Sequence, residues 1–282
     1  MTVAVVTDSS SCLPVALALE RNISVVPLHV MVDGIDHREG VDEIPEHVSS
    51  GTSVTTAGAS PGELIEVYAA ALERSRGDGV VALHISRGLS STWEAARQAA
   101  DEVGPSVRVV DSGSAGMGLG FAVLSAADSA DGGADLDAVY RQAVAASTTS
   151  KCFIVVDRLD HLRRGGRIGT AAALLGTALA MKPVLHISGG ALVLREKTRT
   201  SSKALNKLVD AAVVATSEVG DDSGVALAVH HMQCPERGDN VAAMLTSRIA
   251  GFTSIDVYPF GAVLGAHVGP GAVGVVVAPG RG

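Results

Sequence analysis

The sequence has few aromatic residues. Phe, Trp and Tyr make up 3% of its 282 residues, although 47% of the residues are hydrophobic. Small and aliphatic side chains, chiefly Ala, Val, Leu and Ile, must therefore form most of the core, which is usual for a compact α/β protein. A chain of this length suffices for one large domain or for two domains of ordinary size.

The sequence also lacks an excess of positive charge. It holds 22 Lys and Arg residues against 30 Asp and Glu residues, which gives a formal net charge of −8 at pH 7. Proteins bind the phosphate backbone of nucleic acids through a basic face. The charge balance therefore argues against nucleic acid as a partner.

Cysteine is scarce. Cys12, Cys152 and Cys234 lie far apart and do not have the spacing of metal ligands. We therefore predict no metal site, and we expect the three thiols to be small buried side chains in a reducing cytoplasm.

Long hydrophobic runs are missing as well. The apolar run that starts at Val3 already ends at Asp8 and follows no basic segment, so no signal peptide is predicted. The longest mainly apolar stretches, residues 121–127 and 171–181, are too short to span a bilayer. We expect a cytoplasmic protein without stable membrane insertion.

Motifs of nucleotide chemistry are not found. The chain has no phosphate loop of the G-x-x-x-x-G-K-[ST] type, and its glycine-rich tract 111–120 lacks the G-x-G-x-x-G spacing. Nor is that tract a nucleophile elbow, because Ser112 stands where the motif needs glycine two residues before Ser114. We therefore predict no cofactor, and we expect any nucleotide chemistry to come from a partner.

The first half alternates between apolar runs and helical segments, which predicts a parallel sheet in an α/β domain. The strands are expected at residues 3–6, 23–32, 79–85 and 107–110. In such sheets, ligands bind at the carboxyl ends of the strands. The clearest helix runs to about Arg74, because Ser60 and Glu63 have capping-box spacing and Pro61 fits the first helical position.

A hydroxyl-rich tract, residues 147–150, is the expected domain boundary, with domains at 1–150 and 151–282. Beyond it, Ser188-Gly189-Gly190-Ala191 between two apolar runs predicts a β-hairpin. The fold class is therefore α/β, with an N-terminal parallel-sheet domain and a smaller C-terminal α/β domain whose sheet is mixed or antiparallel.

A basic, glycine-rich turn lies just past the midpoint. Gly165 and Gly166 permit a sharp turn, and Arg167 offers a planar set of donors for a carboxylate or phosphate. The apolar run 171–181 follows and is expected to be a helix. Together they would give an amphipathic anion a clamp for its head and a slot for its tail. The alternative is a solvated arginine in a helix-entry turn beside a core helix.

Three further places could bind an anion. Thr55 and Thr56 lie just before a helix, where their hydroxyls can face a cleft. Ser90 and Ser91 lie at the start of the next helix, and helix N-termini attract anions. Simple capping, or a threonine pair at a strand end, would equally explain these hydroxyls. His267 lies in an expected loop of mostly Gly, Ala, Val and Pro, where it could donate to an anion or to the backbone.

Taken together, short stretches from one end of the chain to the other resemble the DegV family of bacterial fatty-acid-binding proteins, which includes the lipid-carrier subunits of fatty acid kinase. The matching stretches are Val5-Val6-Thr7-Asp8-Ser9, Val26-Pro27-Leu28, Thr55-Thr56 with Ser60-Pro61, Gly88-Leu89-Ser90, Asp111-Ser112 with Met117-Gly118-Leu119-Gly120, Gly165-Gly166-Arg167-Ile168, Lys182-Pro183, and Gly265-Ala266-His267-Val268-Gly269-Pro270-Gly271.

The resemblance implies a fatty acid held between the two domains. By motif position, its carboxylate would be bound by Thr56, Ser90, Arg167 and His267, and we add Ser91 as a neighbour of Ser90 to the predicted ligand-binding residues. Two departures from the family motifs stand out. They are Ala57-Gly58-Ala59 in place of Ser-Gln-Pro, and Arg87 where a small residue is usual.

The resemblance further implies a carrier that has no catalytic residues of its own. It would present the fatty acid to a separate ATP-dependent kinase, which would make acyl phosphate for phospholipid synthesis. One alternative is a hydrolase or acyltransferase that uses Ser90 with His267 as base. A triad also needs a positioned acid, and Arg167 would oppose an imidazolium. Another alternative, a lipid-sensing regulator without a kinase, stays open.

Overall fold

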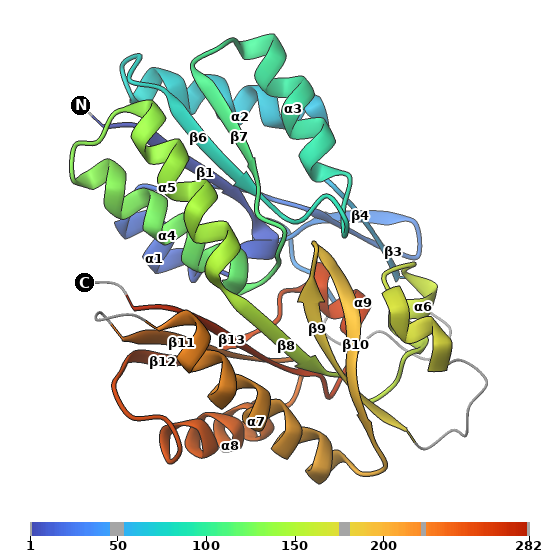
Figure 1. Ribbon diagram of the computed structural model, residues 1–282. Helices are drawn as coiled ribbons and strands as arrows, with labels where there is room; N and C mark the ends of the chain where they lie inside the picture. Colours follow the sequence, from blue (N-terminus) through green and yellow to red (C-terminus); the bar gives the residue numbers. More distant parts are fainter. Residues whose placement is uncertain (1, 46–53, 175–180, 221–223, 281–282) are drawn as a thin grey trace. The chain divides into compact units, whose positions relative to one another are not determined.

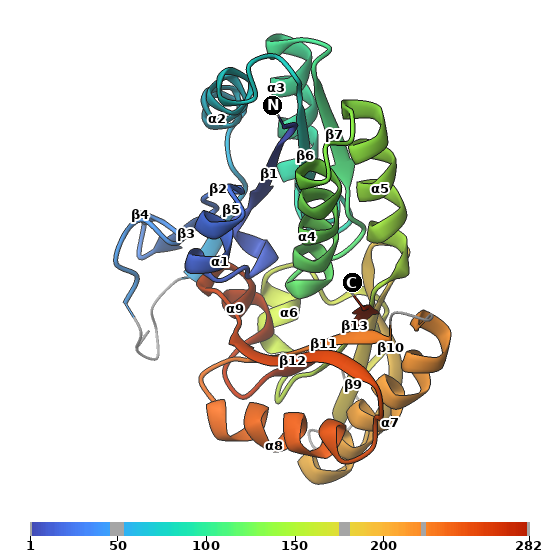
Figure 2. The same ribbon diagram turned by 90° about the vertical axis from the view of Figure 1, so that its left-hand side faces the viewer.

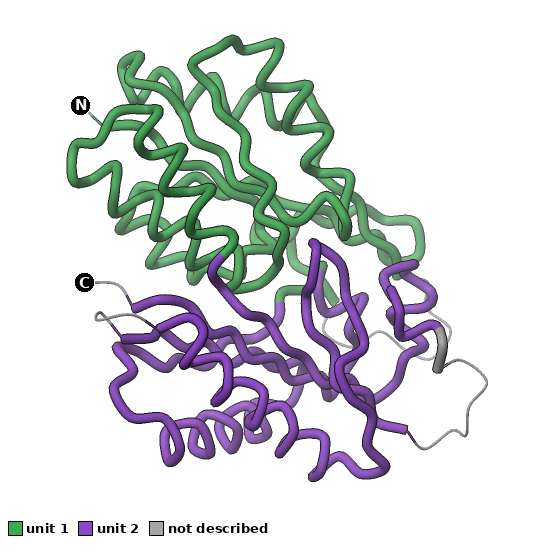
Figure 3. The backbone as a smooth tube through the Cα atoms, in the orientation of Figure 1, with its two compact units in different colours: residues 1–148, 261–263 green, residues 149–260, 264–282 purple. Residues whose placement is uncertain are grey.

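The computed structural model describes residues 2–45, 54–174, 181–220 and 224–280 (Figure 1). The chain divides into two compact units, which Figure 3 colours separately. Unit 1 consists of Met1–Thr148 and Gly261–Val263, and unit 2 of Thr149–Phe260 and Leu264–Gly282.

Unit 1 is built on a four-stranded parallel sheet with the strand order β2-β1-β6-β7. The strands are β1 (Ala4–Asp8), β2 (Ser24–Val26), β6 (Val80–His84) and β7 (Val107–Asp111). Helices cover both faces, which is why β6 is buried along its whole length. The predicted parallel sheet is confirmed.

The helices of unit 1 lie in two groups (Figure 2). On one face are α2 (Pro61–Arg74) and α3 (Thr92–Val103), and on the other α4 (Met117–Asp131) with α5 (Leu136–Thr149) beside it. The short elements η1 (Ser9–Ser11) and α1 (Val15–Glu20) follow β1. The capping box predicted for α2 is present, with the Glu63 N–H 3.3 Å from Ser60 Oγ.

The single strand predicted over residues 23–32 is wrong, because it is divided between two sheets. Pro27 has no N–H to donate to a ladder, so β2 ends before it. The chain then enters a separate antiparallel sheet with the order β4-β3-β5. Its strands are β3 (His29–Val32), β4 (Ile35–Arg38) and β5 (Val54–Ala57).

Unit 2 holds a six-stranded mixed sheet with the order β10-β9-β8-β13-β11-β12, as predicted. The strands are β8 (Lys151–Val155), β9 (Lys182–Ser188), β10 (Ala191–Thr198), β11 (Val225–His231), β12 (Phe252–Pro259) and β13 (Val273–Pro279). The predicted hairpin joins β9 to β10 through Gly189 and Gly190, whose φ angles of 56° and 78° need glycine.

Helices cover the sheet of unit 2 on both faces. The helices α7 (Ser201–Val219) and α8 (Pro235–Thr246) pack on one face. The short elements α6 (Asp160–Arg164), η2 (Gly169–Leu174) and α9 (Ala262–Val268) contribute to the core on the other. The predicted helix over residues 171–181 begins inside η2, and its continuation, residues 175–180, lies outside the described residues.

The hydroxyl-rich tract 147–150 is mostly helical, because Ser147 and Thr148 donate to carbonyls of the preceding turn and α5 continues to Thr149. The two compact units divide within this tract, between Thr148 and Thr149. The loop expected around His267 is helical instead. The segment around His267 forms α9, whose end is closed by a hydrogen bond from the Gly269 N–H to the Gly265 carbonyl, at 2.8 Å. Its Ala and Leu residues favour a helix, and the surrounding glycines concealed that preference.

Candidate functional site

A fully buried polar network lies at the carboxyl ends of β1 and β6. Asp8 Oδ2 accepts hydrogen bonds from His84 Nδ1, at 2.9 Å, and from the Ile85 N–H, at 3.0 Å. Asp8 Oδ1 accepts from the Ser10 N–H, and His84 Nε2 lies 2.6 Å from Tyr68 Oη. Because His84 Nδ1 faces a carboxylate, it carries the proton, and Tyr68 donates to Nε2. The network fixes the backbone where two loops leave the sheet.

The structure shows that Asp8 caps η1. His84, its polar partner, was not predicted from the sequence. The signal was present, because His84 is a polar residue in an otherwise apolar strand, Val80-Val81-Ala82-Leu83-His84. A polar side chain in a buried strand needs a hydrogen-bond partner, and here it has two.

The loop after β6 carries Ser90 and Ser91. The Ser90 N–H donates to the Ser86 carbonyl at 3.0 Å, which folds the loop into a compact turn before α3. Ser90 Oγ lies 2.9 Å from Thr92 Oγ1 and accepts from the Thr92 N–H at 3.3 Å. Ser91 is exposed and occupies the N-cap position of α3, where its side chain makes no capping hydrogen bond within the described chain.

The segment that follows Thr56 lies against this loop. Thr56 is half-buried on β5 and pairs with Val30 of β3. Gly58, two residues later, touches α3 so closely that a Cβ there would come within 2.6 Å of Thr92 Oγ1. The structure therefore places two stretches with predicted ligand-binding residues, those of Thr56 and Ser90, beside each other in unit 1.

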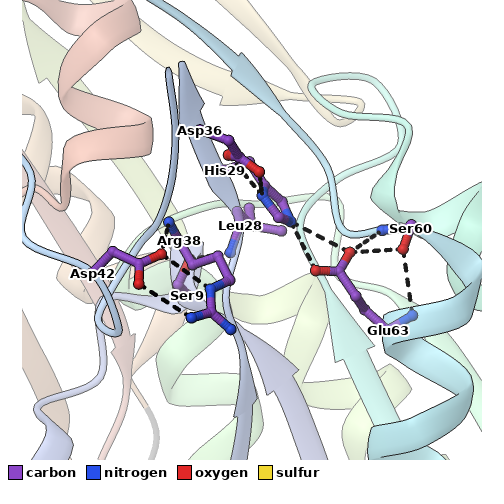
Figure 4. A network of polar contacts seen from close by, with 8 residues as sticks. All are labelled: Ser9, Leu28, His29, Asp36, Arg38, Asp42, Ser60 and Glu63. Carbon is purple, nitrogen blue, oxygen red and sulfur yellow. Dashed lines mark hydrogen bonds and ion pairs between the residues drawn. The ribbon is translucent and has the colours of Figure 1, made fainter. Parts of the chain in front are cut away.

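His29 lies between two carboxylates and connects the three-stranded sheet β4-β3-β5 to α2 (Figure 4). His29 Nδ1 lies 2.9 Å from Asp36 of β4, and His29 Nε2 lies 3.1 Å from Glu63, the carboxylate of the capping box. In the sheet register His29 is opposite Ala57, next to Thr56. The three-stranded sheet that carries Thr56 is thus tied to the N-terminus of α2.

The unusual Arg87 points toward acidic and aromatic partners. Its Nε lies 3.3 Å from Asp111 Oδ2, and its guanidinium lies 5.5 Å from the centre of the Trp93 ring. Because the side chain is 64% exposed, the ion pair adds little stability. The departure from a small residue is thus accommodated at the surface of unit 1.

In unit 2, Arg167 and His267 meet at one glycine. Gly165 ends α6, and the Arg167 guanidinium donates to the Gly165 carbonyl at 2.5 Å. His267 of α9 rests on the same residue, since a Cβ at Gly165 would lie 2.1 Å from His267 Nδ1. Burial, and secondarily the charge of Arg167, lower the pKa of His267 to about 4. The imidazole is therefore neutral at pH 7.

A second contact of this kind joins α6 to the end of α9. A Cβ at Gly269 would lie 2.5 Å from the ring of His161 on α6. Two residues further, Gly271 approaches Asp157, whose carboxylate is 3.2 Å from both Lys182 Nζ and Arg237 Nη1. The glycines of Gly269-Pro270-Gly271 are thus explained by close packing against charged and aromatic side chains.

Among the predicted ligand-binding residues, Thr56, Ser90 and Ser91 of unit 1 offer hydroxyl groups. In unit 2, Arg167 offers a cation and His267 a neutral imidazole. In the described part of the chain, no group of three His, Cys, Asp or Glu side chains is placed to hold a metal ion. No described helix is both long enough and apolar enough to cross a membrane. The assignment of Thr56, Ser90, Ser91, Arg167 and His267 to a ligand stays a prediction.

Comparison with known proteins gives consistent matches over the whole chain. A model of the DegV family, described as an uncharacterised protein family, matches residues 2–280. A DegV domain-containing protein of Mycobacterium tuberculosis is 49% identical over 277 residues, which cover 98% of this chain and 97% of that protein.

Two solved structures are similar in fold and sequence. The crystal structure of a DegV family protein from Corynebacterium glutamicum is 37% identical, with a TM-score of 0.85, and the match covers 100% of this chain and 99% of that one. A structure described as "Fatty Acid Binding of a DegV family Protein", from Thermus thermophilus, is 31% identical, with a TM-score of 0.90 and 99% coverage of both chains.

Proposed function

The chain belongs to the DegV family, and on this premise we propose that it binds one long-chain fatty acid through the carboxylate. The observation that carries the proposal is the convergence of the Arg167 guanidinium and the half-buried, neutral imidazole of His267 on Gly165. A related chain from Thermus thermophilus is described as binding a fatty acid, which supports it.

The chemistry of these groups suits a carboxylate. A buried carboxylate has to be paired with a cation and hydrogen-bonded, because its transfer from water is costly. Arg167 supplies the cation, and a neutral imidazole supplies one N–H donor without a second full charge. Thr56 and Ser90 would donate the remaining hydrogen bonds, with Ser91 beside them. Removing the acyl chain from water contributes about 0.8 kcal/mol for each CH₂ group.

The wider role proposed is that of a carrier. The fatty acid would be shared by domains 1–150 and 151–282 and presented in the cytoplasm to a separate ATP-dependent kinase, which would form acyl phosphate for phospholipid synthesis. This chain would take no part in catalysis and would need no cofactor. The absence of a phosphate-loop motif from the sequence supports the division of labour.

The binding proposal is tested on purified protein. Organic extraction and mass analysis should show one long-chain fatty acid for each chain, or uptake of added oleate or palmitate by empty protein. A protein that is empty and takes up neither would refute the proposal. Incubation with acyl esters, or with ATP and fatty acid, should give no product, and Ser90-dependent hydrolysis would favour an enzyme instead.

The predicted ligand-binding residues are tested by ranking alanine substitutions according to how much each weakens fatty acid binding. Arg167→Ala should be worst, because an unpaired buried carboxylate costs roughly 3–5 kcal/mol, less if water enters. His267→Ala should come next, with Thr56→Ala and Ser90→Ala mildest at about 0.5–1.5 kcal/mol each.

The matched control for Arg167→Ala is Arg163→Ala. It removes an exposed arginine of the neighbouring α6 and should leave the affinity unchanged. If Arg167→Ala bound fatty acid like the parent, the carboxylate would have to lie elsewhere and Arg167 would only close the turn after α6.

A further inference from the structure

Thr92, the first residue of α3, makes two contacts with one atom of Ser90. Its side chain is completely buried, with 0% exposure. Thr92 Oγ1 lies 2.9 Å from Ser90 Oγ, and the Thr92 N–H donates to the same oxygen at 3.3 Å. Ser90, in contrast, is only half-buried, so part of its surface is open to a ligand or to solvent.

The direction of the hydroxyl–hydroxyl bond follows from burial. A buried O–H group needs an acceptor, and leaving it unpaired is costly. Among the residues that the structure describes, Ser90 Oγ is the hydrogen-bond partner of Thr92 Oγ1. If Ser90 donated this bond, the Thr92 proton would be buried without an acceptor. Thr92 therefore donates, and Ser90 accepts.

The direction of this hydrogen bond determines which hydrogen-bonding capacity of the Ser90 hydroxyl remains for a ligand. A hydroxyl has two lone pairs and one proton. The Thr92 N–H and O–H groups occupy both lone pairs, so the Ser90 proton is what remains for a ligand. Such a serine suits a carboxylate, which only accepts, and is poorly suited to attack a carbonyl, because its lone pairs are engaged.

We propose that Thr92 is a positioning residue that turns the Ser90 hydroxyl into a dedicated donor for the ligand's carboxylate. The proposal rests on the proposed fatty acid binding. It gives Thr92 a role outside the predicted ligand-binding residues, and it explains why Ser90 serves as a donor and not as a nucleophile.

Gly58 is the third part of this arrangement. A Cβ at residue 58 would lie 2.6 Å from Thr92 Oγ1 and 3.3 Å from the Thr92 nitrogen. Any larger residue would push the Thr92 hydroxyl away from its present place. The unusual Ala57-Gly58-Ala59 segment therefore leaves room for the Thr92 hydroxyl, and Gly58 acts on Ser90 through Thr92.

A double-mutant cycle on the full-length protein tests the proposal, with oleate affinity as the measurement. Ser90→Ala and Thr92→Val should each weaken binding by about 2- to 10-fold, the range for one hydrogen bond. In the Ser90→Ala background, Thr92→Val should cause less than about a twofold further loss, because coupled residues are not additive. Thr92→Ser, which keeps the hydroxyl, should retain affinity within about twofold.

A second experiment displaces the Thr92 hydroxyl without substituting Thr92 itself. Gly58→Ala should weaken oleate binding in the parent and have no further effect on the Ser90→Ala variant. Gly62→Ala is the matched control, because a Cβ there would meet nothing closer than Ser60 Oγ at 4.0 Å. It should leave the affinity unchanged in both backgrounds.

The outcomes separate this inference from the function on which it rests. If the parent binds oleate but the losses from Ser90→Ala and Thr92→Val multiply, or if Thr92→Ser fails to rescue, the positioning role is overturned and fatty acid binding stands. If the parent binds no fatty acid at all, the proposed function fails, and with it the assignment of the Ser90 proton to a carboxylate.

Discussion

At the scale of single residues, two neighbouring glycines in the turn after α6 have different reasons to be glycine. Gly165 has an ordinary helical φ of −74°, but His267 leaves no space for a Cβ there. Gly166 has a φ of +71°, which disfavours other residues, although a Cβ there would meet nothing within 4 Å. One position is limited by space and the other by backbone conformation.

Gly165→Ala should therefore displace the imidazole of His267. We expect weaker fatty acid binding and a shift of the His267 imidazole resonances, because the ring cannot keep its position beside a methyl group. The measurement is oleate affinity together with NMR of the imidazole.

Gly166→Ala is the control for that prediction. It should lower the free energy of unfolding by about 1–2 kcal/mol through left-handed backbone strain, while the His267 resonances stay in place. If both variants shifted the His267 resonances equally, lack of space could not be the reason for glycine at residue 165 alone.

At the scale of elements, the Asp8 network joins η1, α2 and the ends of two strands. Four groups converge on the Asp8 carboxylate: the Ser10 N–H, the Ser10 hydroxyl, His84 Nδ1 and the Ile85 N–H. Tyr68 of α2 extends the chain of hydrogen bonds through His84. Because all these side chains are buried, each unpaired atom would be costly.

Tyr68→Phe tests the outer end of this network. The substitution keeps the ring and removes the hydroxyl, which leaves His84 Nε2 buried without its donor. We expect the free energy of unfolding to fall by about 1–3 kcal/mol. Asp8→Ala should cost more, because four donors lose their acceptor. If Tyr68→Phe unfolded at the same denaturant concentration as the parent, the contact would carry no net stability.

Elements whose cause is local were predictable from the sequence. The capping box of α2 and the turn at Gly189 depend on a few adjacent residues. The division of the strand at Pro27 also has a local cause, the proline itself. The apolar residues on both sides of it nevertheless suggested one continuous strand. The helix that carries His267 was missed because its glycines suggested a loop, while packing of Val263 and Val268 into the cores stabilises a helix.

At the scale of the molecule, the buried His230 and the half-buried His267 should make stability depend on pH. Burial lowers the pKa of His230, and of His267, from 6.5 to about 4. The unfolded chain therefore binds more protons than the folded protein between these values. Stability is fully present above about pH 6.5 and is lost as the pH falls toward 4. Glu39 acts in the opposite direction, because burial raises its pKa.

Denaturant unfolding at pH 7 and pH 5 measures this effect. The free energy of unfolding should be lower at pH 5, and His230→Gln should reduce the difference between the two pH values. At about 1.4 kcal/mol for each pKa unit, His230 can contribute at most roughly 3 kcal/mol over its whole range. A difference that His230→Gln left unchanged would assign the pH dependence to other groups.

The candidate site was predictable as residue types but not as contacts. Arg167 and His267 lie 100 positions apart in the sequence, and nothing between them indicates that both would meet Gly165. The donor role of Thr92 was not predictable either, because the burial that fixes it comes from the packing of α3 beside Gly58. These contacts depend on packing between residues far apart in the sequence, which local sequence patterns do not indicate.

The central position of β13 has a consequence for the order in which the protein is made. This strand follows all the other strands that the structure describes, yet it lies between β8 and β11 and pairs with both. A ribosome therefore completes β8, β9 and β10, and later β11 and β12, before the strand that joins the two groups exists. Unit 1 needs only Gly261–Val263 from beyond Thr148. It should acquire its fold during translation, whereas a chain that stops at residue 272 leaves unpaired edges on β8 and β11 that invite aggregation.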